Sequence, residues 1–351
     1  MKKEIFQVTT IFIGTIVGAG LASGQEITQF FSTYGLMGFT GLLICCLIYM
    51  VTCTLIVDIS QKYSLSSYTE LITKVGGGYF GKLTDLFTSF FLISGAAIIL
   101  AGSGALIHQY FGVSKWLGIF IMAIVALVVL LNDTKGLIFV NSFIVPALVF
   151  TIILIFTMYI IFFRQSISLD SLIRAREYKS HNFQGMWLLS ALLYAGFNIL
   201  SFTGVLVPLS KEIKSKRHFI YGIFLGAIIL TIISLMINLL LTSNIPNIFK
   251  YEVPLLYIAN HFKGPLEVLL LIIIWCEMFS TEISDVYSVG KTMEKKYNIP
   301  YKKCVYIILA IAIPISQLGF KRLITILYPL FGLVSVVFII KIFIFKKNEV
   351  N

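Results

Sequence analysis

Apolar residues run along this chain in long blocks, separated by short polar or glycine-rich breaks. Ten of these blocks reach the roughly 20 mostly apolar residues that a helix needs to cross a bilayer. They lie at residues 4–31, 36–60, 83–111, 114–132, 136–163, 183–210, 218–242, 265–290, 302–318 and 322–345. The blocks are too long and too continuously apolar for the strands of a membrane barrel. The pattern predicts an all-α integral membrane protein with ten transmembrane helices.

The composition agrees with a chain that lies in lipid. Of the 351 residues, 58% are hydrophobic and 12% are charged, whereas soluble domains are about a quarter charged. The hydrocarbon offers no water to exposed backbone groups, so helices, which satisfy their own backbone, are favoured. We therefore expect the lipid bilayer to surround most of the chain.

The distribution of lysine and arginine predicts the side of the membrane on which each connection lies. If the N-terminus is cytoplasmic, the connections on that side carry 18 of the 27 basic residues. This bias predicts that both termini are cytoplasmic. The net charge of +11 could otherwise indicate a nucleic-acid partner. Because the basic residues are spread over several connections, we expect no nucleic-acid binding.

The ten spans divide into two sets of five. Because five is odd, the second set enters the membrane from the opposite side, so a repeat between the halves would be inverted. The predicted organisation is a first repeat at residues 1–164, an external connection at 165–182 and a second repeat at 183–351. A short amphipathic helix is expected outside the membrane, within residues 253–261.

The first span is interrupted by Gly14, Gly18, Gly20 and Gly24. Glycine lowers helix stability by about 1 kcal/mol per residue relative to alanine, so the helix is expected to unwind between Val17 and Gly20. Unwinding frees N–H groups, which attract an anion, and C=O groups, which attract a cation. The carboxylate of an amino acid and a coupling ion would suit these two ends. The alternative is that the glycines only let helices pack closely.

The sixth span has a comparable interruption, which reads Tyr194, Ala195, Gly196, Phe197 and Asn198. A break at residues 195–198 would offer carbonyl groups to an amino group, and the Tyr194 and Phe197 rings could enclose a side chain. Interrupted segments at corresponding positions of two halves are the best sequence indication of a transporter's binding site. The alternative is ordinary aromatic packing.

The eighth span carries carboxyl and hydroxyl groups, which are expensive in lipid and by default mark ion or proton pathways. Helical spacing places Glu277, Ser280 and Thr281 on one face, with Glu277 about halfway through the span. Such oxygen ligands suit a small cation, for example sodium. A neutral Glu277 could instead carry a proton.

Three further carboxyl groups lie in predicted spans. Glu282 and Asp285 are near the cytoplasmic end of the eighth span, where Lys291 or Lys211 could neutralise them. Glu26 lies in the outer half of the first span. It could gate an outer vestibule or capture a proton, and the alternative is a carboxylate exposed to water.

The opening stretch from Gly14 to Glu26, the length and the ten spans resemble the YkvI family of bacterial membrane proteins. That family looks like a branch of the amino acid, polyamine and organocation superfamily. The resemblance covers essentially the whole chain. It implies the leucine-transporter fold, with two inverted five-helix repeats and broken first and sixth helices, in the bacterial cell membrane.

The resemblance also implies two sites. The superfamily's substrate carboxylate would meet the N–H groups of Gly18, Ala19 and Gly20. The superfamily's sodium site would consist of the carbonyl groups of Gly14 and Val17 and the hydroxyl groups of Ser280 and Thr281. The chain departs from sodium-coupled relatives by having Glu277 one turn before that hydroxyl pair. It departs from some proton-coupled relatives by lacking a lysine midway along the fifth span.

These features favour a secondary active transporter of an amino acid or similar small organic solute, coupled to sodium or protons, without a cofactor or a metal beyond that sodium. The alternative is a non-transporting sensor subunit, because membrane subunits of spore germinant receptors resemble the same superfamily. An enzyme is not expected, since the chain has no H-E-x-x-H or G-x-S-x-G motif and no complete G-x-x-x-x-G-K-[ST] phosphate-binding loop. A passive channel is a remaining alternative. Protein partners are not predicted.

Overall fold

The computed structural model describes residues 2–132, 137–178, 184–213 and 215–350. The predicted boundary between the external connection and the second repeat falls on residues 179–183, outside the described residues. The first helices are α1 (Lys2–Ser23), α2 (Gln25–Phe30), α3 (Leu36–Lys62), α4 (Tyr68–Gly76), α5 (Gly78–Phe111), α6 (Lys115–Asn132) and α7 (Leu137–Phe162). The later helices are α8 (Leu169–Arg174), α9 (Trp187–Glu212), α10 (Lys216–Thr242), α11 (Pro254–Ala259), α12 (Pro265–Tyr297), α13 (Tyr301–Ser316) and α14 (Phe320–Val350). Short 3-10 turns lie at Ser32–Tyr34, Arg164–Ser166, Ala175–Tyr178, Asn247–Lys250 and Asn260–Phe262.

Each predicted span coincides with a helix of the structure, the first being divided into α1 and α2. Among the described residues, seven helices are long and apolar enough to cross a membrane. The helix α12 is not among them, because it carries the carboxyl groups discussed below. A short helix is present within residues 253–261, as α11.

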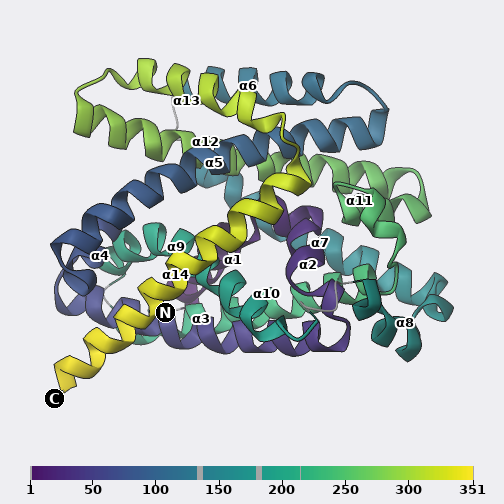
Figure 1. Ribbon diagram of the computed structural model, residues 1–351, viewed down its shortest axis with the longest axis horizontal. Helices are drawn as coiled ribbons and strands as arrows, with labels where there is room; N and C mark the ends of the chain where they lie inside the picture. The colour runs from purple at the N-terminus through teal and green to yellow at the C-terminus, as the bar shows by residue number, and fades with distance from the viewer. Residues whose placement is uncertain (1, 133–136, 179–183, 214, 351) are drawn as a thin grey trace.

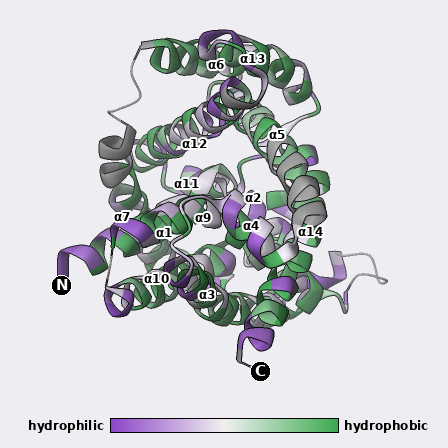
Figure 2. Cartoon of the chain, turned by 90° about the vertical axis from the view of Figure 1, so that its left-hand side faces the viewer, coloured by the Kyte–Doolittle hydropathy of each residue, from purple (hydrophilic) through white to green (hydrophobic). Residues whose placement is uncertain are grey.

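The long helices pack into a bundle. In Figure 1, α6 and α13 form one edge, α3 and α10 form the opposite edge, and α1 and α9 lie between them. The sides that face outward are mostly hydrophobic (Figure 2). Exposed examples are Leu43 and Leu47 on α3, Phe120 on α6, Ile228 on α10 and Ile340 on α14. An apolar exterior of this extent is suited to lipid rather than water.

Two ion pairs and one contact between a carboxyl group and a histidine hold one end of the bundle together. The three contacts are Glu4–His218, Asp58–Lys216 and Lys62–Glu349, with closest N–O distances of 2.7, 2.8 and 3.0 Å. They connect the beginning of α1 to the beginning of α10, α10 to the end of α3, and α3 to the end of α14. Both termini therefore lie on the same side of the bundle.

The first part of α1 packs against α10 in the interior. Gly222 and Gly226 of α10 allow a close approach, since a Cβ atom on them would lie 2.5 Å from Val8 and 2.8 Å from Phe12. The Phe12 ring also packs edge-on against Phe202 of α9, at 4.9 Å between centroids. The first half of the broken helix is thus held by side-chain packing.

The predicted break in the sixth span is wrong, because α9 is helical throughout. Gly196 serves packing instead: a Cβ atom there would lie 3.2 Å from the carbonyl oxygen of Gly332 in α14. The Asn198 side chain donates to the carbonyl of Tyr194 one turn earlier (3.1 Å) and to the hydroxyl of Tyr49 (3.1 Å). Glycine here permits contact between two helices, and asparagine bonds within the helix and to α3.

Candidate functional site

The backbone of α1 leaves the helical conformation at Gly18, with φ of 40° and ψ of −175°. This is the unwinding that the sequence predicts between Val17 and Gly20. Gly18 is half-buried, and a Cβ atom on it would have no heavy atom within 4 Å. The break therefore borders open space.

A second turn at Gly24, with φ of 79°, separates α1 from α2. It brings the side chain of Glu26 back over the break. A Cβ atom on Gly20 would lie 2.0 Å from Oε1 of Glu26, so this carboxyl group rests on the backbone of Gly20. Glu26 is 3% exposed, and the alternative of a carboxylate exposed to water is wrong.

Two tyrosines flank the Glu26 carboxyl group. The hydroxyl groups of Tyr194 in α9 and Tyr328 in α14 lie beside it. The side chain of Tyr194 is 2% exposed, and neither its hydroxyl nor Oε2 of Glu26 forms a hydrogen bond of standard geometry. Buried polar atoms without partners are rare in native structures and call for an explanation.

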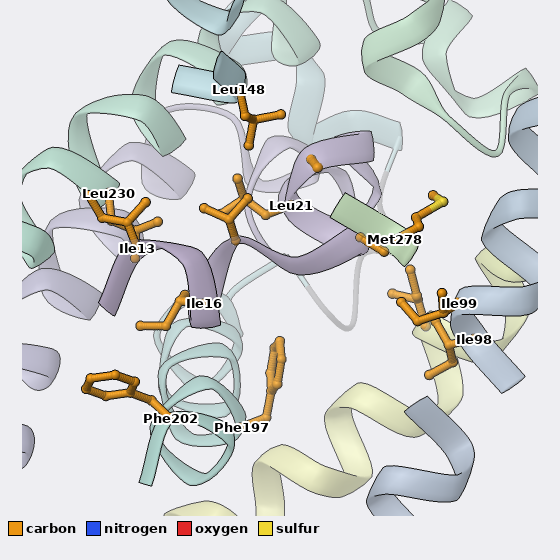
Figure 3. Close-up of a cluster of buried hydrophobic side chains, with 14 of the residues drawn as sticks. Ile13, Ile16, Leu21, Ile98, Ile99, Leu148, Phe197, Phe202, Leu230 and Met278 are labelled. Carbon is orange, nitrogen blue, oxygen red and sulfur yellow. The ribbon is translucent and has the colours of Figure 1, made fainter. Parts of the chain in front are cut away.

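Aromatic rings complete these surroundings. The Tyr194 ring packs against Phe30, Phe31 and Phe197, with centroid distances of 5.4, 4.9 and 5.4 Å. Phe197 in turn contacts Tyr328 at 4.6 Å. Figure 3 shows Phe197 rising from α9 towards the part of α1 that carries Ile16 and Leu21, on either side of the break.

The predicted site residues of the sixth span separate into two groups. Tyr194 and Phe197 join the aromatic group beside Glu26. Ala195 instead lies against Cys45 of α3, and Gly196 faces α14. The Asn198 side chain donates a hydrogen bond to the hydroxyl of Tyr49. The residues predicted to offer free carbonyl groups therefore have structural roles.

The predicted ion site brings α1 and α12 together, and these helices pack against each other. Glu277 and Ser280 are buried. The Thr281 hydroxyl donates to the carbonyl of Glu277 at 3.0 Å. Gly14 borders α7, where its Cβ atom would lie 2.8 Å from Val145. Val17, the other predicted backbone ligand, is fully buried.

The expected partners of Glu282 and Asp285 are wrong. Lys291 pairs with Glu294 at 2.8 Å, and Lys211 donates to Ser66. Glu282 is fully buried, and neither of its carboxyl oxygens has a hydrogen-bond partner. Asp285 faces α5, since a Cβ atom on Gly95 would lie 2.4 Å from its Oδ2 atom.

Within the described part of the chain, the charged groups of the interior are carboxyl groups. No lysine, arginine or histidine there forms an ion pair with Glu26, Glu277, Glu282 or Asp285. No group of three or more histidine, cysteine or acidic side chains among these residues could hold a metal ion. The site can offer carboxyl groups, hydroxyl groups and aromatic faces.

Comparison with known proteins supplies the family. No protein-family model matches the chain. It is 32% identical over 338 residues to the uncharacterized membrane protein YkvI of Bacillus subtilis (strain 168), and the match covers 96% of this chain and 95% of that protein.

The fold is similar to two solved structures. One is the inward-facing conformation of Mhp1, with a TM-score of 0.68 and 13% identity over 94% of this chain and 73% of that one. The other is a mutant of the manganese transporter of Eremococcus coleocola, with a TM-score of 0.67 and 13% identity over 97% and 79% of the two chains. Both have the leucine-transporter fold that the sequence resemblance implied. The identity to YkvI over nearly the whole chain, together with the apolar helices, shows that the protein is a multi-pass membrane protein of the YkvI family.

Proposed function

We propose that this chain is a secondary active transporter of an amino acid or similar small organic solute, coupled to sodium or protons by alternating access. The observation that carries the proposal is the break at Gly18, which opens the backbone of α1 beside open space. Half-helix ends in such a position receive substrates and coupling ions in transporters. Mhp1, which has the same fold, is a nucleobase-cation-symport-1 family transporter.

The proposed arrangement in the membrane has ten spans in two inverted repeats, with both termini in the bacterial cytoplasm. The placement of both termini on one side of the bundle supports an even number of spans. The excess of basic residues in the connections on that side supports its assignment to the cytoplasm.

The coupling ion has two candidate sites. Sodium would bind oxygen atoms near Thr281 and the end of the first half of α1. A proton would instead be carried by Glu277, which is 3% exposed. Either species would compensate for the carboxyl groups that lie in the interior without basic partners.

Ligand-dependent thermal stability of the purified protein tests the proposal. The probes are amino acids, amines and small organic acids, each with sodium or potassium at neutral and acidic pH. A ligand at 100 times its dissociation constant should stabilise the fold by about 2.7 kcal/mol if it binds only the folded state. The probe that stabilises should then be taken up by proteoliposomes under an ion gradient.

Two variants assign the coupling ion. If sodium is coupled, Thr281→Ala should remove the sodium dependence of ligand binding and Glu277→Gln should retain it. If protons are coupled, Glu277→Gln should remove the pH dependence and Thr281→Ala should retain it. Saturable binding without uptake under any gradient would contradict transport and favour a sensor. Uptake that does not saturate and depends on neither sodium nor protons would indicate a channel.

A further inference from the structure

We propose that Glu26 is the group that binds the ammonium group of the substrate, beside the Gly18 break and within the rings of Phe30, Tyr194, Phe197 and Tyr328. The inference rests on the proposed function and specifies the substrate class as a solute with a protonated amino group. It assigns to Glu26 a binding role in place of a gate.

The carboxyl group of Glu26 lies close to the break in α1. Oε1 of Glu26 rests on Gly20, two residues after the break, because a Cβ atom on Gly20 would lie 2.0 Å from it. A substrate bound beside Gly18 would therefore lie close to a carboxyl group of the chain. A cationic group is attracted to that position, whereas a second carboxylate is repelled.

The unpartnered atoms point to the same ligand. Oε2 of Glu26 and the hydroxyl of Tyr194 are buried and form no hydrogen bond of standard geometry, although the tyrosine lies close enough to interact with the carboxyl group. Buried polar atoms of this kind are normally satisfied. An ammonium group has three N–H donors, and it could donate to both oxygen atoms at once.

No described titratable group that faces Glu26 carries a positive charge, so a cation from outside the chain could pair with it. The described titratable groups that face Glu26 are Tyr194 of α9, Tyr328 of α14 and Tyr49 of α3. All three are tyrosines, and none of them brings a positive charge. A buried carboxylate without a cationic partner is costly, so binding an ammonium group would remove an unfavourable interaction.

The aromatic rings beside Glu26 can also attract a positively charged group. Phe30, Tyr194, Phe197 and Tyr328 form a continuous group with neighbouring centroids 4.6 to 5.4 Å apart. The faces of such rings attract ammonium groups and provide a larger attraction where water is excluded. Carboxylate and ring faces together form the usual chemistry of a site for an organic cation.

The continuity of α9 explains why a carboxyl group is needed. A break in this helix would have supplied free carbonyl groups for the amino group of a substrate. Because α9 is helical throughout, its carbonyl groups are used within the helix. Glu26 supplies the missing acceptor from α2.

The test uses matched probes that differ only in their charged groups. Each series contains an amino acid, the amine without its carboxylate and the acid without its amino group. Suitable series are alanine, ethylamine and propionate; leucine, isopentylamine and isocaproate; and phenylalanine, phenethylamine and hydrocinnamate. Binding of each probe to the full chain in detergent is measured by thermal shift and by isothermal titration.

The variants are Glu26→Gln, which keeps the side-chain shape and removes the charge, and Glu267→Gln as the matched control at the outer end of α12. In at least one series the amine should bind the wild type, and Glu26→Gln should weaken its binding by at least about 30-fold, as expected when a buried charged partner is lost. Glu267→Gln should bind like the wild type. Tyr194→Phe, which keeps the ring and removes the hydroxyl, should weaken binding of the amine by about 5-fold. A single cooperative unfolding transition of Glu26→Gln in the absence of probes shows that it folds.

The outcomes separate this inference from the proposed function. Binding of acids alone, or equal binding of amines by wild type and Glu26→Gln, overturns the role of Glu26 and leaves a transporter for another class of solute. A loss of pH dependence in Glu26→Gln with unchanged amine affinity also overturns it, because the residue would then carry only a proton. If no probe of any class binds the wild type, the proposed function itself fails.

Discussion

Replacing Gly18 with leucine is expected to abolish solute uptake while the chain still inserts into the membrane. The backbone at Gly18 has φ of 40° and ψ of −175°, a conformation that costs a residue with a side chain about 1–3 kcal/mol. Leucine would favour straightening of the helix, and its side chain would enter the open space beside the break. Both effects act on the proposed binding site. Because the apolar spans are unchanged, insertion should not be affected.

Gly204→Leu is the control for this experiment. Gly204 lies in α9 with ordinary helical geometry, and a Cβ atom there would also have no heavy atom within 4 Å. Adding the same side chain at Gly204 should retain uptake. The measurement is proteoliposome uptake of the probe that stabilises the wild type, with monodispersity checked by gel filtration. Normal uptake by Gly18→Leu would show that the break is not part of the transport site.

The helices were predictable because lipid imposes a simple requirement on the sequence. Each span needs enough apolar residues to cross the hydrocarbon and must bond its own backbone, so the blocks of apolar residues are visible without any knowledge of packing. The break at Gly18 was predictable for a related reason, since several glycines in one span weaken its helix. Gly196 shows the limit of this argument. A glycine that lets α14 approach and a glycine that unwinds a helix are identical in the sequence.

The site was predictable only in part, because its contacts join distant segments. The sequence shows that Glu26 is a carboxyl group in the first span, but its position depends on two turns. The turn at Gly24 lets Glu26 reach Gly20, whereas a straight helix would place residues 20 and 26 on different faces. Tyr328 comes from α14, far along the chain, and nothing local to either residue indicates that they meet.

The prediction that Lys291 or Lys211 neutralises Glu282 and Asp285 was wrong for a similar reason. Lys291 follows Glu282 by about two and a half helical turns and Asp285 by less than two, which suggested neutralisation. The structure instead pairs Lys291 with Glu294, three residues further on, and turns Asp285 towards α5. The direction in which a helix face points is decided by the neighbouring helices, which a local pattern does not contain.

The contact between α9 and α14 leads to the second large expected effect: Gly332→Leu should strongly lower the stability of the folded protein. A Cβ atom on Gly332 would lie 2.6 Å from the carbonyl oxygen of Leu193 and 2.9 Å from its Cα atom. These are backbone atoms, so they cannot turn aside, and α14 would have to move away from α9. Overpacking of this kind typically costs about 1–3 kcal/mol and occasionally more, and leucine brings further atoms than the Cβ alone.

Gly204→Ala, on the exposed side of the same helix pair, is expected instead to raise the stability of the folded protein. Its methyl group would meet no atom within 4 Å, and alanine should stabilise the helix by about 0.5–1 kcal/mol relative to glycine. Thermal unfolding of the two variants in one detergent, monitored by tryptophan fluorescence and gel filtration, therefore compares a packed and an unpacked glycine. Equal melting temperatures for wild type and Gly332→Leu would contradict the close approach of α9 and α14. Since Tyr194, Phe197 and Tyr328 lie on these two helices, that result would also contradict the arrangement of rings around Glu26.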